Sequence, residues 1–168
     1  IYRGRWQEHL KSRGRYYLEQ ADKLDELHAK NPAVGAHASA LALRALGAIM
    51  EECRLQKLTR HQHVTSKLGK LIAAAECAAC FSRAAAADRY SESVRFDKAG
   101  WQAMARIFAR ETALSVATEG LALVLGAAEQ AGALADAMNM DAVQAEQKGL
   151  VSDMDLVALK LKQTFKAK

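Results

Sequence analysis

The alanine content of this chain is the feature that most restricts its fold, with 35 alanines and a single proline among 168 residues. Alanine has the highest helix propensity, and proline is the residue that disfavours a helix most. Aromatic residues make up only 6% of the sequence, whereas strands are usually rich in aromatic and β-branched residues. The composition therefore predicts an all-α protein and argues against a β-sandwich or a β-barrel.

The length fits one domain of ordinary size, and an apolar content of 51% is enough to drive collapse of the chain. A chain of this size buries roughly 68–70% of its unfolded surface, so a core can form without metal or disulfide support. We expect residues 1–168 to form a single helical domain with its core at about 33–126. Because the sequence begins with Ile, we expect a fragment or the C-terminal domain of a longer chain.

Helical spacing of apolar residues predicts four long helices. Their expected ranges are Arg5–Lys30, Ala33–Thr59, His63–Asp88 and Asp97–Leu125. Gly14 is a weak point in the first range, Pro32 ends that range, and Asp97 suits the N-cap of the fourth. Short connections favour antiparallel neighbours, so we expect an up-and-down antiparallel four-helix bundle. Tyr90–Phe96 is the expected linker, and Ala127–Met138 and Asp153–Phe165 are expected as additional C-terminal helices.

The apolar pattern also predicts which side chains point inward. The third range carries a regular helical stripe formed by Val64, Leu68, Leu71, Ile72, Ala75 and Ala79. In the fourth range the expected inward residues are Met104, Ile107, Phe108, Leu114, Ala117, Leu121, Val124 and Leu125. Both ranges are rich in alanine, which lets two helix axes approach closely.

The chain is mildly basic, with a net charge of +5. Five basic residues lie near its start: Arg3, Arg5, Lys11, Arg13 and Arg15. Such a cluster can contact nucleic acid, an anionic membrane or an acidic protein, or it can simply form a solvated helix face. No nucleic-acid recognition motif follows it, so no nucleic-acid partner is expected.

Three cysteines, an odd number in a chain that needs no disulfides, indicate reduced intracellular thiols. Cys77 and Cys80 form a C-x-x-C pattern, but it lies in mid-helix rather than at a helix N-terminus, where the dipole would lower the thiol pKa. A zinc site would need a second ligand pair, and Cys53 does not supply one. We therefore expect these cysteines to be core residues.

Other candidate groups also lack the spacing that chemistry needs. His61 and His63 are two apart and point to different sides of a helix, which indicates a solvated junction, and Asp25 and His28 form a lone pair. The sequence contains no Glu-x-x-His pair for a di-iron bundle, and no phosphate-binding or nucleophile motif. The least ordinary carboxylates are Glu51, Glu52, Glu111 and Glu119, the last two being expected as ion-pair partners within the bundle. No catalytic, cofactor-binding or metal-binding residue is assigned.

The sequence also bears on location. Its first residues lack the apolar segment of a signal peptide, and the longest strongly apolar stretch, Gly120–Ala128, is far shorter than the ~20 residues that span a bilayer. We therefore expect an intracellular protein, in a bacterial cytoplasm or a mitochondrion, with peripheral membrane association as an option.

Two stretches resemble the helical C-terminal region of acyl-CoA dehydrogenases. One runs from Lys67 to Glu76, KLGKLIAAAE, with Arg83 near the helix end, and the other from Ala105 to Gly126, ARIFARETALSVATEGLALVLG. In that family the second helix leads into a Gly-Gly-x-Gly segment that contacts the flavin across the dimer. Here Gly126 is followed by AAEQ, and the glutamate-glycine-threonine stretch near the flavin is missing.

Very-long-chain acyl-CoA dehydrogenases and some bacterial relatives carry a second helical domain after the catalytic part. Leu41–Leu46, Lys57–His63 and Lys67–Leu68 resemble that appended domain, so the likeness covers about Leu41 to Gly126. The resemblance implies a non-catalytic helical domain of a flavoprotein that oxidises fatty acyl-CoA. The domain would hold no cofactor, with FAD bound by the parent. Its expected partners are the catalytic part, a second copy in a homo-oligomer, a membrane surface or an electron-acceptor protein.

Two alternatives remain open at this stage. The chain can be a stand-alone helical-bundle binding module that uses its basic N-terminal face for an anionic partner. It can also be a bundle with an apolar interior pocket for an acyl chain, although alanine-rich facing helices usually close such a cavity.

Overall fold

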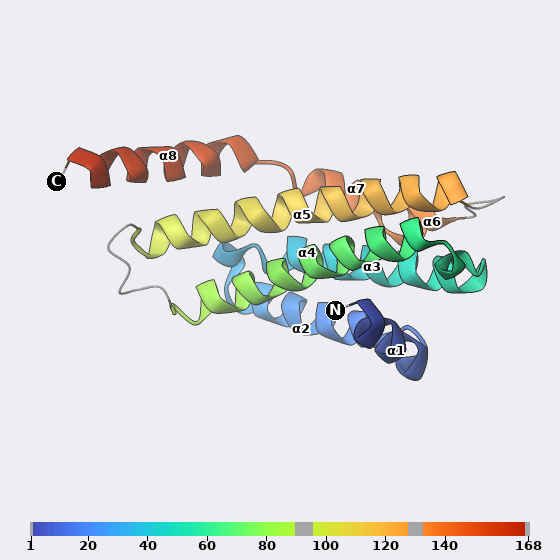
Figure 1. The fold of residues 1–168 in the computed structure, drawn as a ribbon. Coiled ribbons are helices and arrows are strands. Elements are labelled where there is room, and N and C mark those ends of the chain that lie inside the picture. The colour runs from blue at the N-terminus through green and yellow to red at the C-terminus, as the bar shows by residue number, and fades with distance from the viewer. Residues whose placement is uncertain (1, 90–95, 128–132, 167–168) are drawn as a thin grey trace.

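The computed structural model of the protein describes residues 2–89, 96–127 and 133–166, in which it contains helices and turns and no strand (Figure 1). The α-helices are α1 Tyr2–Ser12, α2 Arg15–Lys30, α3 Ala36–Leu55, α4 Gln62–Ala86, α5 Lys98–Ala127, α6 Leu134–Ala137, α7 Met140–Ala145 and α8 Leu150–Lys166. Two 3₁₀ turns, η1 Pro32–Val34 and η2 Leu58–Arg60, flank α3. The predicted all-α class is confirmed.

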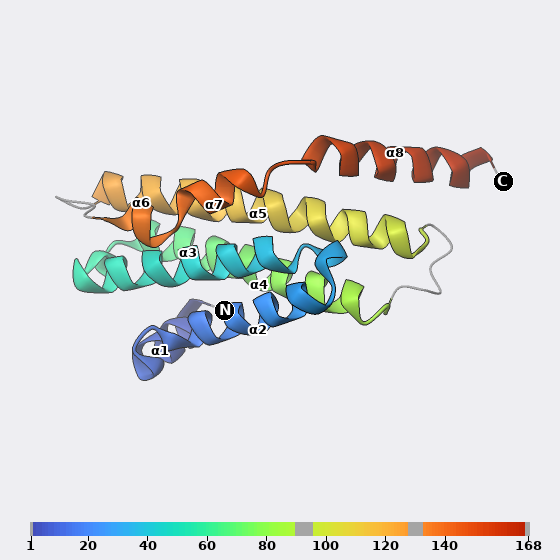
Figure 2. The same ribbon diagram turned by 180° about the vertical axis from the view of Figure 1, so that it is seen from behind.

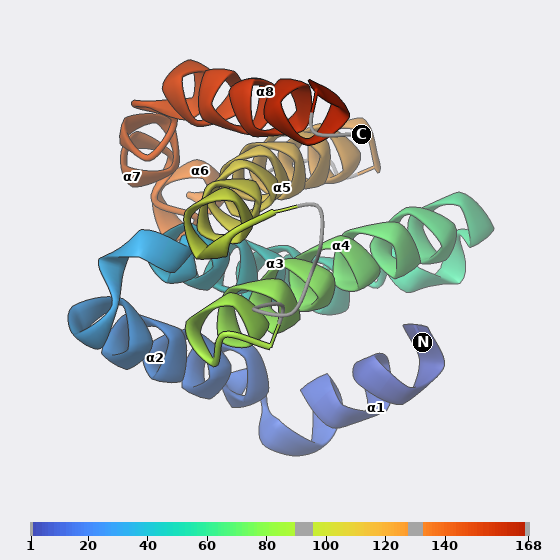
Figure 3. The same ribbon diagram turned by 90° about the vertical axis from the view of Figure 1, so that its left-hand side faces the viewer.

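Helix α3 lies at the centre of the packing. It contacts α2, α4 and α5, while α4 and α5 also pack on each other and α8 packs on α5 (Figures 1 and 3). Seen from behind, α1 and α2 lie on one side of the α3–α4 layer, and α5 and then α8 lie on the other (Figure 2). Within the described residues, α2 and α5 are not close neighbours, as they would be in a closed four-helix bundle. The finer expectation of an up-and-down bundle stays a prediction.

The first predicted helix, Arg5–Lys30, is wrong as a single element. It is broken between Ser12 and Arg15, where Arg13 and Gly14 adopt left-handed backbone angles with φ of 52° and 80°. Glycine adopts this conformation without the steric penalty that a side chain brings. The break turns α1 away from the axis of α2, so that α1 contacts α4 and α3 as well as α2.

Most other boundaries follow the prediction. Asp97 caps α5 as expected, since its Oδ1 accepts a hydrogen bond of 2.9 Å from the backbone N–H of Gly100. The break before α4 comes slightly earlier than predicted, at 56–61. The predicted linker residues 90–95 and residues 128–132 of the predicted 127–138 helix lie outside the described part of the chain. Of that predicted helix only α6 is described as helical, and α7 was not predicted.

The inward face of α5 consists mainly of small residues. The predicted core positions Ala117 and Val124 are buried, but Phe108 and Leu125 are exposed, which makes those two predictions wrong. The buried residues of α5 are Gly100, Ala103, Ala105, Ala109, Thr112, Ala113, Val116, Ala117, Gly120 and Val124. Small side chains allow α3 and α4 to approach the α5 backbone, and the bulkier residues are turned toward its margins.

Candidate functional site

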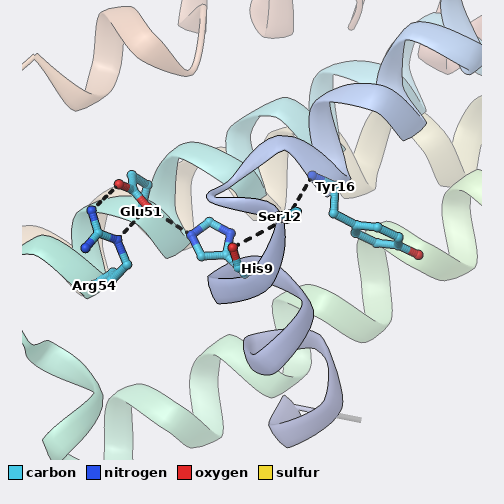
Figure 4. Close-up of polar contacts among 5 residues, drawn as sticks. All are labelled: His9, Ser12, Tyr16, Glu51 and Arg54. Carbon is cyan, nitrogen blue, oxygen red and sulfur yellow. Dashed lines mark hydrogen bonds and ion pairs between the residues drawn. The ribbon is translucent and has the colours of Figure 1, made fainter.

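A cluster of His9, Glu51 and Arg54 joins α1 to α3 and is the most enclosed histidine site in the structure's described part (Figure 4). His9 is 1% exposed, and its Nε2 donates a hydrogen bond of 3.1 Å to Oε2 of Glu51. Arg54 approaches the same carboxylate with Nε at 2.9 Å and Nη2 at 2.5 Å. The two-pronged geometry of the guanidinium fixes the carboxylate, which in turn orients the imidazole.

The electrostatics of this cluster favour a neutral histidine beside an ionised glutamate. Burial lowers the pKa of His9, although the hydrogen bond to Glu51 opposes that shift. The hydrogen bond from Arg54 lowers the pKa of Glu51, and His9 adds to the effect. Since a carboxylate can only accept, the proton of the neutral imidazole lies on Nε2, and Nδ1 is a buried acceptor without a hydrogen-bond partner in the described residues.

A cavity of about 270 Å³ lies beside the cluster and is lined by His9, Leu10, Arg13, Glu51 and Arg54. A second cavity, of about 330 Å³, shares Arg13 and Glu51 and extends toward Arg44 and Ala137. Glu51 lines both cavities, but its carboxylate is engaged by Arg54 and His9, and the unpaired nitrogen of His9 is buried. The arrangement therefore ties α1 to α3.

Two further polar clusters join neighbouring helices. Asp25 of α2 accepts hydrogen bonds from Nδ1 of His37 at 2.7 Å and from Nη1 of Arg44 at 2.6 Å, both on α3. Between α1, α2 and α4, Glu76 accepts from the Tyr17 hydroxyl at 2.9 Å and from Arg5. Burial, followed by the Glu76 charge, raises the pKa of Tyr17 well above its usual value.

The fourth cluster attaches α8 to α5. Asp153 is buried and pairs with Arg106 and Arg110, and Arg106 Nη1 also donates to the carbonyl of Ala33 at 2.5 Å. Burial alone would raise the pKa of Asp153, but the two guanidinium groups, Arg106 first, hold it below its usual value. Together these contacts form an ion-pair and hydrogen-bond network that joins α8, α5 and the η1 turn.

Sequence reasoning placed the cysteines incorrectly in part. Cys53 is buried as expected, but Cys77 and Cys80 are exposed, so the prediction of core cysteines is wrong for that pair. The buried residues of α4 next to these two cysteines are Ala75, Ala78 and Ala79, so both thiols lie on the outer side of the helix.

The remaining candidate residues are distributed over the surface. His61 and His63 are exposed at the start of α4, which confirms a solvated junction. Asp25 pairs with His37 and Arg44, and no direct bond to His28 is present. Glu119 pairs with Lys67 at 3.4 Å, as expected for an ion-pair partner, but this pair is exposed, and Glu111 is exposed as well.

Sequence reasoning missed His9 and Asp153 as centres of polar clusters. A signal for Asp153 existed in the sequence. Leu156 and Val157 follow it by three and four positions, so Asp153 lies on the same side of the predicted amphipathic helix as these apolar residues. No such signal existed for His9, because its partner Glu51 is 42 positions away.

Within the described residues, no group of three or more His, Cys, Asp or Glu side chains is arranged to hold a metal ion. Among the same residues, no helix combines the length and apolar character that crossing a bilayer requires. The chain was also compared with protein-family models, with curated proteins and with solved structures, and none of these comparisons yields a match.

Proposed function

We propose that this chain is a non-catalytic helical domain of an acyl-CoA dehydrogenase-like flavoprotein that oxidises fatty acyl-CoA. The domain packs on the catalytic part, supports assembly of the parent protein and leaves flavin binding to that parent. The observation that carries the non-catalytic role is that the buried polar clusters join one helix to another. The flavoprotein parentage is supported by the sequence resemblance alone.

The positions of the resembling segments fit this proposal. The first lies in α4 and the second in α5, and these two helices pack against each other along the chain's central layers. Two helices that pack against each other are the arrangement we expect if both resembling segments derive from one helical unit of that family. After Gly126 the sequence lacks the second glycine and the glutamate-glycine-threonine stretch of flavin-binding members, which favours a domain without its own flavin.

Reading the coding sequence on both sides of the segment tests the parentage directly. The proposal expects that the same reading frame, or a neighbouring co-transcribed reading frame, encodes a flavin-binding sheet and a catalytic glutamate. Their absence from both would refute the parentage while leaving the structural role of the clusters intact.

Flavin binding tests the non-catalytic role independently. The purified chain, expressed with excess riboflavin, is expected to be colourless and to leave the fluorescence of added FAD unchanged. A stoichiometric yellow complex would contradict the proposal. If such a complex did form, the His9→Gln variant would show whether flavin binding depends on His9.

A second candidate is a binding module for an anionic partner, favoured by the basic side chains near the α1–α2 turn. Arg5 is engaged by Glu76 and by the ring of Tyr16, but Lys11, Arg13 and Arg15 are exposed together around that turn. Binding to heparin or to anionic vesicles that weakens steeply with added salt, and is lost in a Lys11→Glu, Arg13→Glu variant, would support this candidate.

The up-and-down arrangement of the four long helices belongs to the same proposal. Consecutive contacts of α2 with α3, α3 with α4 and α4 with α5 support it. An experimental structure of the parent protein would test whether a further helix from the catalytic part completes the packing beside α2 and α5.

A further inference from the structure

We infer that α8 is a self-association helix that pairs antiparallel with α8 of a second copy of this chain. The inference does not depend on the flavoprotein parentage. It starts from a row of exposed apolar residues on α8, beside the side of the helix that packs on α5.

The inner face of α8 is held by charged contacts. Asp153, in the first turn of α8, pairs with Arg106 and Arg110. No other acidic residue in the described part of the chain is buried. Further along, Lys160 Nζ lies 2.6 Å from Oδ2 of Asp97. Among the described helices α8 packs closely on α5 alone, at the outer edge of the molecule (Figure 3).

The outer side of α8 carries a second set of apolar side chains. Val151 is 69% exposed, Met154 39% and Leu161 38%, and Ala158 between them is also exposed. These positions follow a spacing of three, four and three residues, which places them on one side of the helix as in the seam of a coiled coil. Leu156 and Val157, on the inner side of α8, are half-buried, whereas the apolar residues of this row stay exposed, which indicates a contact surface for another helix.

The charged residues beside this seam indicate which partner helix covers it. Exposed Asp155 lies beside the seam in the first half of α8, and exposed Lys162 occupies the equivalent position one heptad later. An antiparallel pair with its two-fold axis near Leu159 places Asp155 of each copy beside Lys162 of the other. Both ion pairs then form by symmetry, as an isologous interface requires. A parallel pair would instead bring the two acidic halves together.

Two further properties fit the same register. Ala158 of each copy faces Leu161 of the other, so a small residue is opposed by a large one and the axes can approach closely. The antiparallel orientation also opposes the two helix dipoles favourably. The centre of the seam and the charges beside it are therefore self-complementary in shape and in charge.

The test is the oligomeric state of the full 168-residue chain, measured by sedimentation velocity over a range of concentrations. The wild-type chain is expected to form a concentration-dependent dimer, and the Met154→Glu, Leu161→Glu variant is expected to be monomeric over the same range. Glutamate keeps a high helix propensity, so α8 itself is retained, as circular dichroism can verify. Leu55→Glu, at a more exposed leucine on α3, is the control and should leave the dimer unchanged.

A charge exchange tests the register. Asp155→Lys alone and Lys162→Asp alone are each expected to weaken dimerisation by about tenfold, since each turns two symmetric ion pairs into two repulsive pairs. The double exchange should restore wild-type dimerisation. Asp155 and Lys162 are seven positions apart on one helix, so recovery reports contact between copies.

Three outcomes would overturn the inference. A wild-type chain that is monomeric at every concentration leaves the seam without this occupant, and a dimer that survives the two glutamate substitutions uses another surface. Co-sedimentation of a monomeric chain with anionic vesicles, lost in the Met154→Glu, Leu161→Glu variant, would assign the seam to a lipid surface instead.

Discussion

Arg106 Nε donates a hydrogen bond of 2.9 Å to Oδ2 of Asp153, across 47 positions of sequence, and so links the middle of the molecule to its last helix. Arg110 approaches the same carboxylate, and Arg106 also reaches the carbonyl of Ala33. A single aspartate therefore pairs with two partly buried guanidinium groups. This ion-pair cluster holds α8 on α5, while Val151 and Met154 of α8 stay exposed.

Removing this carboxylate should be costly. The Asp153→Asn substitution keeps the shape of the side chain but leaves two arginines without their counter-charge, so we expect the free energy of unfolding to fall by about 2–4 kcal/mol. Urea denaturation followed by circular dichroism measures the change, and faster amide hydrogen exchange in α8 would locate it. Glu111→Gln, at an exposed position of α5, should change stability by no more than about 0.5 kcal/mol. Equal effects of the two substitutions would contradict this role.

Stability should depend on pH through His9. Burial lowers the pKa of His9 below its usual value of 6.5, so the unfolded chain binds more protons than the folded one just below that pH. The free energy of unfolding should therefore be constant above about pH 7 and decrease as the pH falls through 6.5 toward the folded-state pKa. His9→Gln, which keeps an N–H donor but does not titrate, should flatten this decrease. His63→Gln, at an exposed position, should preserve it.

A second loss of stability is expected in more acidic solution. The pKa values of Asp25 and Asp153 are lowered in the folded state, since the hydrogen bonds from His37 and Arg44 and from Arg106 and Arg110 outweigh the effect of burial. A lowered carboxylate pKa contributes stability above the unfolded pKa, and this contribution is lost as the pH falls through the folded pKa. Urea titrations at pH 5 and below should show this step in the wild-type chain and a smaller one in Asp153→Asn.

The close approach of α3 and α5 at Gly120 can be tested by a double-mutant cycle. A Cβ atom at Gly120 would lie 2.0 Å from Cδ1 of Ile49, so Gly120→Ala should destabilise the protein by about 1–3 kcal/mol. In an Ile49→Ala background the clash is gone, and the same substitution should become neutral or stabilising by up to about 1 kcal/mol through helix propensity. Gly126→Ala, which would meet no atom within 4 Å, is the control and should not destabilise. Additive effects would disprove the contact.

The three thiols should differ in reactivity. Cys77 and Cys80 are exposed on α4, whereas burial raises the pKa of the Cys53 thiol to about 11. An aromatic disulfide reagent should therefore label two thiols rapidly in the native chain and the third only on unfolding. Mass spectrometry of the labelled chain identifies the sites. Labelling of Cys53 at the rate of the other two would show that α3 opens locally.

Several elements of the fold could be predicted because they depend on local patterns. The range of α4 follows from the apolar spacing of Val64, Leu68 and Ile72, and the start of α5 follows from Asp97 as its cap. The outward position of Cys77 is consistent with the same stripe, because Cys77 is two positions after Ala75 and so lies on the opposite side of the helix; the prediction of a core cysteine did not apply that spacing. Phe108 was expected to lie in the core because it is apolar, but small residues such as Ala109 occupy the contact.

The amino-acid sequence by itself determined that this chain is helical and approximately where most of its long helices lie, since helix propensity and apolar periodicity act within a few residues. Only the tertiary structure decided how the helices meet. It separated α1 from α2 at Gly14, brought Glu51 to His9, and joined Asp153 to Arg106 and Arg110. These contacts span tens of positions, and their free energy depends on burial and charge neutralisation that exist only once the distant helices have packed.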